Sequence, residues 1–460
     1  MKLNLKAIRR ALALAAMLGL ALHAAPARAE YSFAVHIDGK LDDAAWRKGR
    51  ALSAFRTFDG QTPQAATVGR ILTDERYLYL AFRCVEPQME KLEATPLERD
   101  GKLWTNDCIE LFFAPFFAQE EYYHLIIDAN GQIYDAFKRD GVEDVRYETA
   151  AVARTQKQTA GWTLEVAIPL CDVGLTRARD ALMNFGRERK PVTENTAWHG
   201  VFGQPATWKR VPLSLGERFG VDVRGWNFGS PAPQYGRNEA TLELAAGPSA
   251  PLPVLLAAQE NGRWNPKARR AIPSTPSQRA PRVTLPYNLL PQQKPQRLRL
   301  AVENGGQTVF RVTYRLNLPA SALVATLSAP YYYAGDKYGF VRLESFLSTA
   351  GLQAGRIRLS VQAPGGRTVA VRELRPLRRS QRAGFAISAW HNGSGTLTAE
   401  LFSGDQLLAR RQLPVIKRAG PFDGSTPLSC GCFKFASRCY NKGGTGAGPP
   451  GNRRKIRRTI

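Results

Sequence analysis

Long apolar runs are nearly absent from this chain of 460 residues. Beyond Ala25, no segment approaches the roughly 20 consecutive apolar residues that a membrane-spanning helix requires. We therefore expect no transmembrane segment in the mature protein. The chain also lacks a Gly-x-Ser-x-Gly nucleophile elbow and a Walker-type phosphate-binding loop. These absences argue against a serine hydrolase and against a nucleotide cofactor.

Histidine and cysteine are scarce, with 5 and 6 residues respectively. His36, His124 and His199 stand alone, without the spacing of a metal site. The cysteines form two groups of three, and an odd number per group gives no disulfide framework. They are Cys84, Cys108 and Cys171 in the first half, and Cys430, Cys432 and Cys439 near the end. Cys84 and Cys108 lie in successive strand patterns and could pair, or both could be buried free thiols.

The first 29 residues have the pattern of a secretory signal peptide. Lys2, Lys6, Arg9 and Arg10 form a basic start, an alanine-rich apolar stretch runs to Ala25, and Ala27-Arg28-Ala29 supplies a cleavage site. Because the apolar stretch is short, it is a poor membrane span. We expect an exported bacterial protein that is periplasmic, on the cell surface or extracellular.

Alternation of apolar and polar residues with a period of two dominates the next part of the chain. Strand patterns at eight positions, separated by turn residues, predict a β-sandwich over residues 30–227. The patterns are Thr67–Thr73, Tyr77–Cys84, Cys108–Phe113, Tyr123–Asp128, Gln132–Asp135, Ala150–Thr155, Trp162–Ile168 and Leu182–Arg189. Tryptophan beside carboxylates and amides suits sugar binding, because the ring takes the C–H face and the polar groups take the hydroxyls.

The remainder divides into three parts. Twelve of the 30 prolines fall between Pro231 and Pro295, so residues 228–295 are predicted to be a proline-rich linker or bridging layer. Three glycine-containing turns between alternating runs predict an immunoglobulin-like β-sandwich over residues 296–418. Residues 419–460 show no strand or helix period and end in a basic run, so we expect a disordered basic tail. The fold class is therefore all-β.

The formal net charge of +25 comes mostly from residues 263–418 and from the C-terminal basic run. Such a charge favours anionic partners, and in an exported protein these would be anionic glycans or the cell envelope. An arginine-rich face that is simply solvated explains the same residues. Nucleic acid is a less suitable partner for an exported protein.

Five short segments of the first domain, in order along nearly 190 residues, resemble the family 9 carbohydrate-binding modules. They are Ile37–Trp46 (IDGKLDDAAW), Ile71–Phe82, the Trp104-x-x-Asp107-x-x-Glu110 segment, Gly161–Pro169 and Asn184–Arg189. The resemblance covers about two fifths of the chain and ends near residue 228. It implies a DOMON-like β-sandwich at residues ~31–224 that binds sugars, often with structural calcium. Haem, which some DOMON relatives bind through Met or His ligands, is not expected here, because Met89, Met183 and the isolated histidines form no such pair.

The resemblance also implies a set of sugar-binding residues. Trp104 is similar to the first of two tryptophans between which the sugar lies, and Trp208 or Trp198 would be the second. Glu110 matches the carboxylate that hydrogen-bonds the sugar, and Asp128 falls where the family usually has asparagine. The chain departs from the pattern at Ile126, where a sugar-binding member has arginine.

Asp107 and Glu165 are two further carboxylates for which the sequence favours a role other than sugar binding. Asp107 and Glu110 are separated by an odd number, so they should point to opposite faces of a regular strand and could not form a glycosidase pair. Asp107 is instead expected to be a structural residue or a calcium ligand. Glu165 lies within an aliphatic strand and is expected to pair with Arg187 or Arg189.

The sequence thus predicts a secreted, non-catalytic protein that recognises a poly- or oligosaccharide and is associated with carbohydrate degradation. Two alternatives stay open. The chain could be an accessory or truncated part of a secreted glycoside hydrolase. It could also be a structural envelope protein whose module has lost its ligand, as Ile126 suggests.

Overall fold

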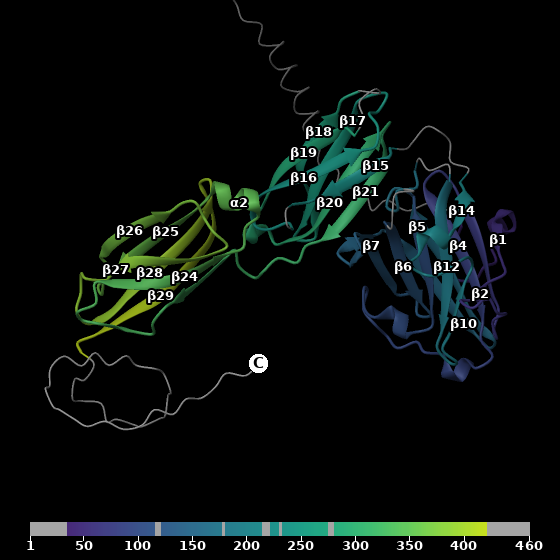
Figure 1. Cartoon of the computed structure of the whole chain (residues 1–460), viewed down its shortest axis with the longest axis horizontal. Helices are drawn as coiled ribbons and strands as arrows, with labels where there is room; N and C mark the ends of the chain where they lie inside the picture. Colours follow the sequence, from purple (N-terminus) through teal and green to yellow (C-terminus); the bar gives the residue numbers. More distant parts are fainter. Residues whose placement is uncertain are drawn as a thin grey trace, which may run out of the picture.

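The computed structural model describes residues 35–115, 121–176, 180–213, 221–229, 232–274 and 280–420. These residues form three β-sandwiches that follow one another along the molecule (Figure 1). The predicted all-β class is confirmed, since α2 (Thr349–Ala354) is the one α-helix within the described ranges. The predicted signal peptide and most of the predicted tail, with Cys430, Cys432 and Cys439, lie outside the described residues.

The N-terminal sandwich packs a five-stranded sheet against an eight-stranded sheet. The five-stranded sheet has the order β1 (Arg50–Leu52), β3 (Thr67–Thr73), β4 (Tyr77–Val85), β11 (Gly161–Pro169) and β10 (Val152–Gln158). The eight-stranded sheet has the order β2 (Arg56–Thr57), β13 (Glu194–Ala197), β12 (Asp180–Arg189), β5 (Cys108–Ala114), β6 (Tyr122–Asp128), β7 (Ile133–Arg139) and β8 (Val142–Asp144), with β14 (Lys209–Pro212) also paired to β12. All eight strand patterns seen in the sequence are strands here.

Four short 3-10 helices lie in the connections of this domain. They are η1 (Ala44–Lys48), η2 (Met89–Lys91), η3 (Leu103–Thr105) and η4 (Pro205–Thr207). The connections that carry η3 and η4 matter for function, because their side chains pack on the outward face of the eight-stranded sheet.

The second sandwich includes most of the predicted linker. A three-stranded sheet has the order β15 (Val223–Asn227), β16 (Gly236–Leu244) and β19 (Arg282–Leu289). A five-stranded sheet has the order β18 (Arg263–Ile272), β17 (Leu252–Glu260), β20 (Pro295–Asn304), β21 (Gln307–Arg315) and β9 (Tyr147–Glu148), with η5 (Pro291–Gln293) before β20.

Of the two predictions for residues 228–295, a proline-rich linker or a bridging layer, the linker was therefore wrong, because β16 to β19 belong to a packed sandwich. Proline removes one backbone donor, which an edge strand tolerates because that donor can face solvent. Pro266 and Pro286 lie on β18 and β19, which are edge strands of their sheets. The proline count was high because the domain has edge strands and turns, not because it lacks a packed core.

The third sandwich is shorter than the predicted 296–418, because β20 and β21 belong to the second. One sheet has the order β22 (Leu323–Leu327), β24 (Tyr338–Ser345) and β27 (Ser380–Ala386). The other has the order β23 (Tyr332–Tyr333), β29 (Gln406–Arg418), β28 (Gly393–Ser403), β25 (Gly355–Gln362) and β26 (Thr368–Leu374). The three predicted glycine turns are confirmed as the β20–β21, β25–β26 and β28–β29 hairpins.

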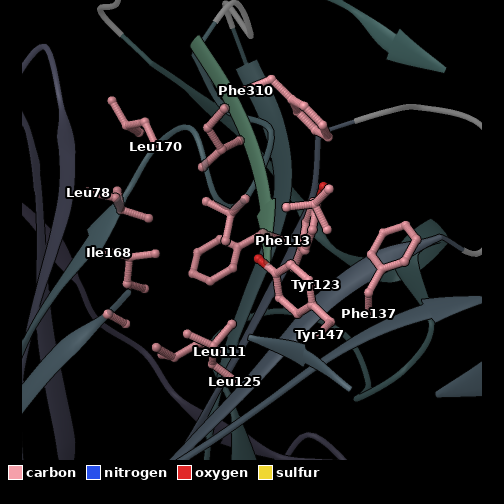
Figure 2. Close-up of a cluster of buried hydrophobic side chains, with 14 of the residues drawn as sticks. Leu78, Leu111, Phe113, Tyr123, Leu125, Phe137, Tyr147, Ile168, Leu170 and Phe310 are labelled. Atoms are coloured by element: carbon pink, nitrogen blue, oxygen red, sulfur yellow. The ribbon is translucent and has the colours of Figure 1, made fainter. Parts of the chain in front are cut away.

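One hydrophobic core runs through the first two sandwiches. Phe310 of β21 packs in the same cluster as Tyr123, Tyr147 and Leu170 of the N-terminal domain (Figure 2). Strand β9 of the first domain extends the sheet of the second by pairing with β21. The third sandwich has a different core cluster, which Tyr235 of the second domain also joins. The first two domains are therefore one packed unit.

Buried charges in the N-terminal domain pair differently from the prediction. Glu165 accepts hydrogen bonds from the backbone N–H groups of Asp38 (3.0 Å) and Gly39 (2.8 Å) and from Nε1 of Trp46 (2.8 Å). The predicted pairing of Glu165 with Arg187 or Arg189 was thus wrong. Both arginines instead bind Glu86, which lies at the end of β4.

Cys84, Cys108 and Cys171 are buried free thiols, so the considered Cys84–Cys108 disulfide does not form. Burial raises the pKa of the Cys84 thiol to about 12, which keeps it neutral and unreactive. Across the described residues, no helix is long and apolar enough to span a membrane.

Candidate functional site

The outward face of the eight-stranded sheet gathers polar and aromatic groups from strands far apart in sequence. Side chains alternate between the two faces of a strand, so Glu110 and Phe112 of β5 share a face with Tyr122 and His124 of β6. The register places Phe112 directly opposite His124. On the other side of β5, Cys108 lies opposite Glu188 of β12.

A row of charged side chains crosses the middle of this face. His124 Nε2 lies 2.9 Å from Glu110 Oε2, and His124 Nδ1 lies 2.6 Å from Glu143 Oε1 of β8. The Glu188 carboxylate lies within 4.8 Å of that of Glu110 and also pairs with Lys190. We call Glu110, His124, Glu143 and Glu188 the polar row.

The polar row holds a charged histidine. Burial by itself lowers the pKa of His124, but its contacts with Glu110 and Glu143 more than offset this and raise the pKa to about 9. Both ring nitrogens therefore donate at neutral pH. Burial, and then the neighbouring Glu110, raise the pKa of Glu188 to about 7. Burial raises the pKa of Glu143, but His124, Tyr134 and Lys138 together outweigh burial, and the pKa ends below its usual value.

Trp104 stands beside one end of the polar row. It lies in η3, its residue surface is 41% exposed, and its ring meets that of Tyr134 edge-on at 5.8 Å between centroids. The Tyr134 hydroxyl donates to Glu143 at 3.2 Å. The Tyr134 phenol thus contacts both an exposed indole and an accessible carboxylate, whose side chain is 35% exposed.

Aromatic side chains also cover the other end of the face. Phe112, Tyr122 and Trp208 form a small buried cluster there, with Phe202 partly buried against it. The Trp208 ring lies 5.3 Å from that of Phe112, and its Nε1 donates to the Val201 carbonyl at 2.8 Å. This tryptophan is a packing residue and offers little surface to a sugar.

Trp198, the other candidate for a second platform, is half-buried against the core. Its ring packs on Phe185 at 5.6 Å, and Lys209 lies 5.0 Å from its centroid. The exposed aromatic ring nearest this end of the face is instead Phe58, which meets Phe202 edge-on at 4.9 Å and is 45% exposed.

Asp128 is a structural residue of the β6–β7 turn. Its Oδ1 accepts from the backbone N–H groups of Asn130 (3.0 Å) and Gln132 (2.8 Å), and its Oδ2 accepts from Asn106 Nδ2 at 2.8 Å. Being fully buried, the carboxylate stabilises the turn and presents no free oxygen to a ligand.

Asp107, the residue expected to be structural or a calcium ligand, has contacts that suit a structural role. It accepts from the backbone N–H of Glu93 at 3.0 Å, and burial raises its pKa to about 6. Asp128 is filled by N–H donors as described. Cys108, Glu110 and Glu188 come together, but calcium takes oxygen ligands and a thiol is a poor one.

Sequence reasoning found Trp104 and Glu110 on this face but missed His124, Glu143 and Glu188. His124 was read as isolated because its two partners lie 14 and 19 residues away. The alternation along the two strands could have indicated the position of His124. One hairpin contains both strands, and its outward face carries Glu110, Phe112, Tyr122 and His124. Glu143 gave no comparable signal, because β8 is only three residues long.

Ile126 lies under the connection that carries η3. It is buried in a small apolar cluster with Leu103, Cys108, Tyr134 and Ala136. An arginine expected at this position would need space that this chain fills with apolar side chains.

Comparisons with known proteins bear on the N-terminal domain. Residues 37–202 match the family described as carbohydrate family 9 binding domain-like. No curated protein matches the chain.

Among solved structures, the chain is similar to a candidate carbohydrate-binding protein from Bacteroides uniformis ATCC 8492, with 16% identity, covering 35% of this chain and 86% of that one at a TM-score of 0.29. It is also similar to a red sea bream transglutaminase, with 11% identity, covering 52% and 38% at a TM-score of 0.20. A marsupial T cell receptor shows 10% identity, covering 76% and 99% at a TM-score of 0.18. With TM-scores this low, none of the three structures contributes to the assignment.

The family match covers the segments on which the resemblance rested, from the Ile37-Asp38-Gly39 turn to the strand that ends at Arg189. The predicted resemblance is confirmed: residues 37–202 of this chain are similar to the carbohydrate family 9 binding domain-like family.

Proposed function

We propose that this protein binds carbohydrate without cleaving it, at the end of the polar row where Trp104 and Glu143 lie together. A sugar ring would stack its C–H face on Trp104, and its hydroxyls would hydrogen-bond the Glu143 carboxylate. The family of the N-terminal domain supports sugar binding in general. The position on this face is our inference from the geometry.

The observation that carries the proposal is an accessible acceptor held rigid beside an exposed indole. Glu143 is fixed from two sides, by His124 at 2.6 Å and by the Tyr134 hydroxyl at 3.2 Å. Tyr134 in turn supports Trp104 edge-on. A preorganised acceptor loses little entropy on binding, so even one stacking ring can give measurable affinity.

The polar row is poorly arranged for glycoside hydrolysis. A glycosidase holds two carboxyl groups about 5–9.5 Å apart across the substrate. Glu110 and Glu188 lie within 4.8 Å of each other, and Glu110 is almost fully buried. A sugar could not pass between them, which favours a non-catalytic role.

We further propose that the protein acts outside the cytoplasm, in the breakdown of a polysaccharide. The N-terminal basic and apolar stretch that ends at Ala27-Arg28-Ala29 supports export. The appearance of such modules with secreted glycoside hydrolases supports the link to degradation. The basic surface beyond residue 263 would add attraction to anionic glycans, and that attraction should weaken with salt.

The test is a glycan-array and affinity-gel screen of the mature full chain, with calcium and with chelator. Trp104→Ala should strongly weaken retention by the glycan that wild type binds, while circular dichroism stays unchanged. Tyr338→Ala is the matched control, because Tyr338 is an aromatic residue of the third domain that is also exposed. Retention equal to that of wild type in Trp104→Ala would contradict the proposed site, and no binding to any glycan would favour a structural role in the envelope.

A further inference from the structure

A cavity with aromatic and polar walls lies where the first two sandwiches meet. The β7–β8 hairpin of the N-terminal domain faces β15 and β21 of the second domain across it. Its volume is about 310 Å³, at the lower end of the range for small-ligand sites. We call it the junction cavity. Its walls include Phe137, Arg139, Val142, Asp144, Trp226 and Tyr314.

Trp226 supplies the apolar surface of the junction cavity. Its ring centroid lies 5.6 Å from Phe137, 5.8 Å from Phe228 and 6.2 Å from Tyr314. Those three neighbours are buried, whereas Trp226 is only half-buried. The Arg139 guanidinium lies over part of the indole, 5.3 Å from the ring centroid. The rest of the exposed indole surface lines the cavity and is suited to the C–H face of a sugar.

Each of the two arginines around the junction cavity is paired with a carboxylate, and the exposed Asp140 adds a further negative charge. Arg139 binds Glu121 at 2.8 Å and donates to the Trp226 carbonyl at 3.2 Å. Arg146 makes two hydrogen bonds to Asp144, at 2.8 and 2.9 Å. An anionic ligand would gain no uncompensated cation here. Neutral hydroxyl groups suit the cavity better, because paired side chains still offer both donors and acceptors.

The junction cavity is preformed because the domains are fixed to each other. Arg297 reaches Glu148 at 2.5 Å, and Arg311 binds Asp172 through two hydrogen bonds of 2.5 and 2.8 Å. The Tyr314 hydroxyl donates to Asp144 at 2.8 Å. Neither domain alone would form the walls.

We propose that the junction cavity is a second carbohydrate subsite that takes a neutral sugar ring against Trp226. The choice of a sugar as the ligand of the junction cavity rests on the function proposed above, whereas the position of the cavity does not. The two sites lie on opposite sides of one short strand, because neighbouring residues of β8 serve them: Glu143 belongs to the polar row and Asp144 to the cavity. A polysaccharide held at both points would be retained more strongly than a single sugar.

The test uses saturation-transfer difference NMR on the full chain. The probes are methyl β-D-glucopyranoside, methyl β-D-galactopyranoside and methyl β-D-xylopyranoside. Trp104→Ala removes the first platform. Val142→Trp fills the junction cavity from a side chain that is 68% exposed, so the fold should tolerate it. Val68→Trp is the matched control, on a strand valine of the opposite sheet that is 50% exposed.

The junction subsite is supported if a probe signal persists in Trp104→Ala. Adding Val142→Trp to that variant should then remove the signal, whereas adding Val68→Trp should leave it. A signal lost completely in Trp104→Ala alone overturns the junction subsite and leaves the proposed function intact. A signal that only Val142→Trp removes supports the subsite and contradicts the proposed first site. No signal from any probe with the wild type contradicts both.

Discussion

His124 shows how one residue can couple sugar recognition to pH. It is buried between Glu110 and Glu143, and those carboxylates keep it charged by raising its pKa to about 9. A protonated His124 donates to both carboxylates and so fixes the oxygen atoms of Glu143 that a ligand could reach. A neutral His124 can donate to only one of them, and the row would lose its rigidity.

We expect stability to fall as pH rises from about 6.5 to 9. The pKa of His124 is higher in the folded state than the ordinary histidine value of 6.5, so the folded protein binds a proton that the unfolded chain releases in this range. The contribution is complete below pH 6.5, is lost through pH 9, and is on the order of 3 kcal/mol. Urea denaturation at several pH values measures it. His124→Asn should reduce the slope over this range, and a wild type of constant stability there would refute the charged histidine.

The carboxylate of Glu143 gives a second prediction at this scale. Glu143→Gln keeps the shape but removes the charge, so sugar affinity should fall about fivefold, as for the loss of a hydrogen bond of about 1 kcal/mol. The pKa of His124 should also fall. Calorimetric titration measures the affinity, and NMR of the imidazole measures the pKa. Glu239→Gln, at an exposed glutamate of the second domain, should change neither. Unchanged affinity in Glu143→Gln would remove this residue from the site.

At the scale of elements, much of the family pattern proves to be structural. Gly39 has a φ of +87°, and a Cβ there would meet the Thr155 carbonyl carbon at 2.9 Å. Its N–H, with that of Asp38, is held by Glu165, which also binds Trp46. The Ile37-Asp38-Gly39 turn and Trp46 therefore fasten the N-terminal segment to β11. They identify the domain without contacting a ligand.

The network of Glu86 with Arg187 and Arg189 fastens β12 to the end of β4. Glu86 Oε2 lies 2.6 Å from Arg189 Nε and 3.2 Å from Arg187 Nη2, and all three residues are buried. Glu86→Gln should cost about 3–5 kcal/mol of unfolding free energy, because it leaves the buried Arg187 without its paired carboxylate and Arg189 with only Glu194 at 3.9 Å. Glu90→Gln, at an exposed residue nearby, should stay within about 0.5 kcal/mol. Equal denaturation midpoints for the two variants would contradict this role for Glu86.

Elements were predictable where the cause is local. The eight strands and three hairpins followed from alternation and turn glycines, which act within a few residues. Trp208 could not be judged in this way, because its burial depends on Phe112 and Tyr122, nearly 100 residues away in sequence. The linker prediction failed for a related reason, since proline is tolerated or excluded according to a strand's place in the sheet.

At the scale of the whole molecule, the chain consists of one two-domain unit followed by a separate third sandwich. The first two domains share a core cluster and the third has a different one. Arg311 of the second domain binds Asp172 of the first domain, whose side chain is almost fully buried. The binding face thus belongs to a rigid body larger than the domain that carries the family pattern.

Calorimetry of the full chain should therefore show two transitions, one for the joined domains and one for the third. Arg311→Met should lower only the midpoint of the joined unit, since it leaves Asp172 buried without its cation. Arg342→Met, at an exposed residue of the third domain, should shift neither midpoint appreciably. Three transitions, with the second domain insensitive to Arg311→Met, would show that the two domains unfold independently.

The most direct test of the central claim is a crystal structure of the mature chain soaked with the oligosaccharide that the affinity screen selects. The account predicts a sugar ring stacked on Trp104 with a hydroxyl hydrogen-bonded to Glu143, on the outward face of the eight-stranded sheet. A sugar bound only on the five-stranded sheet, or only on the third sandwich, would contradict it.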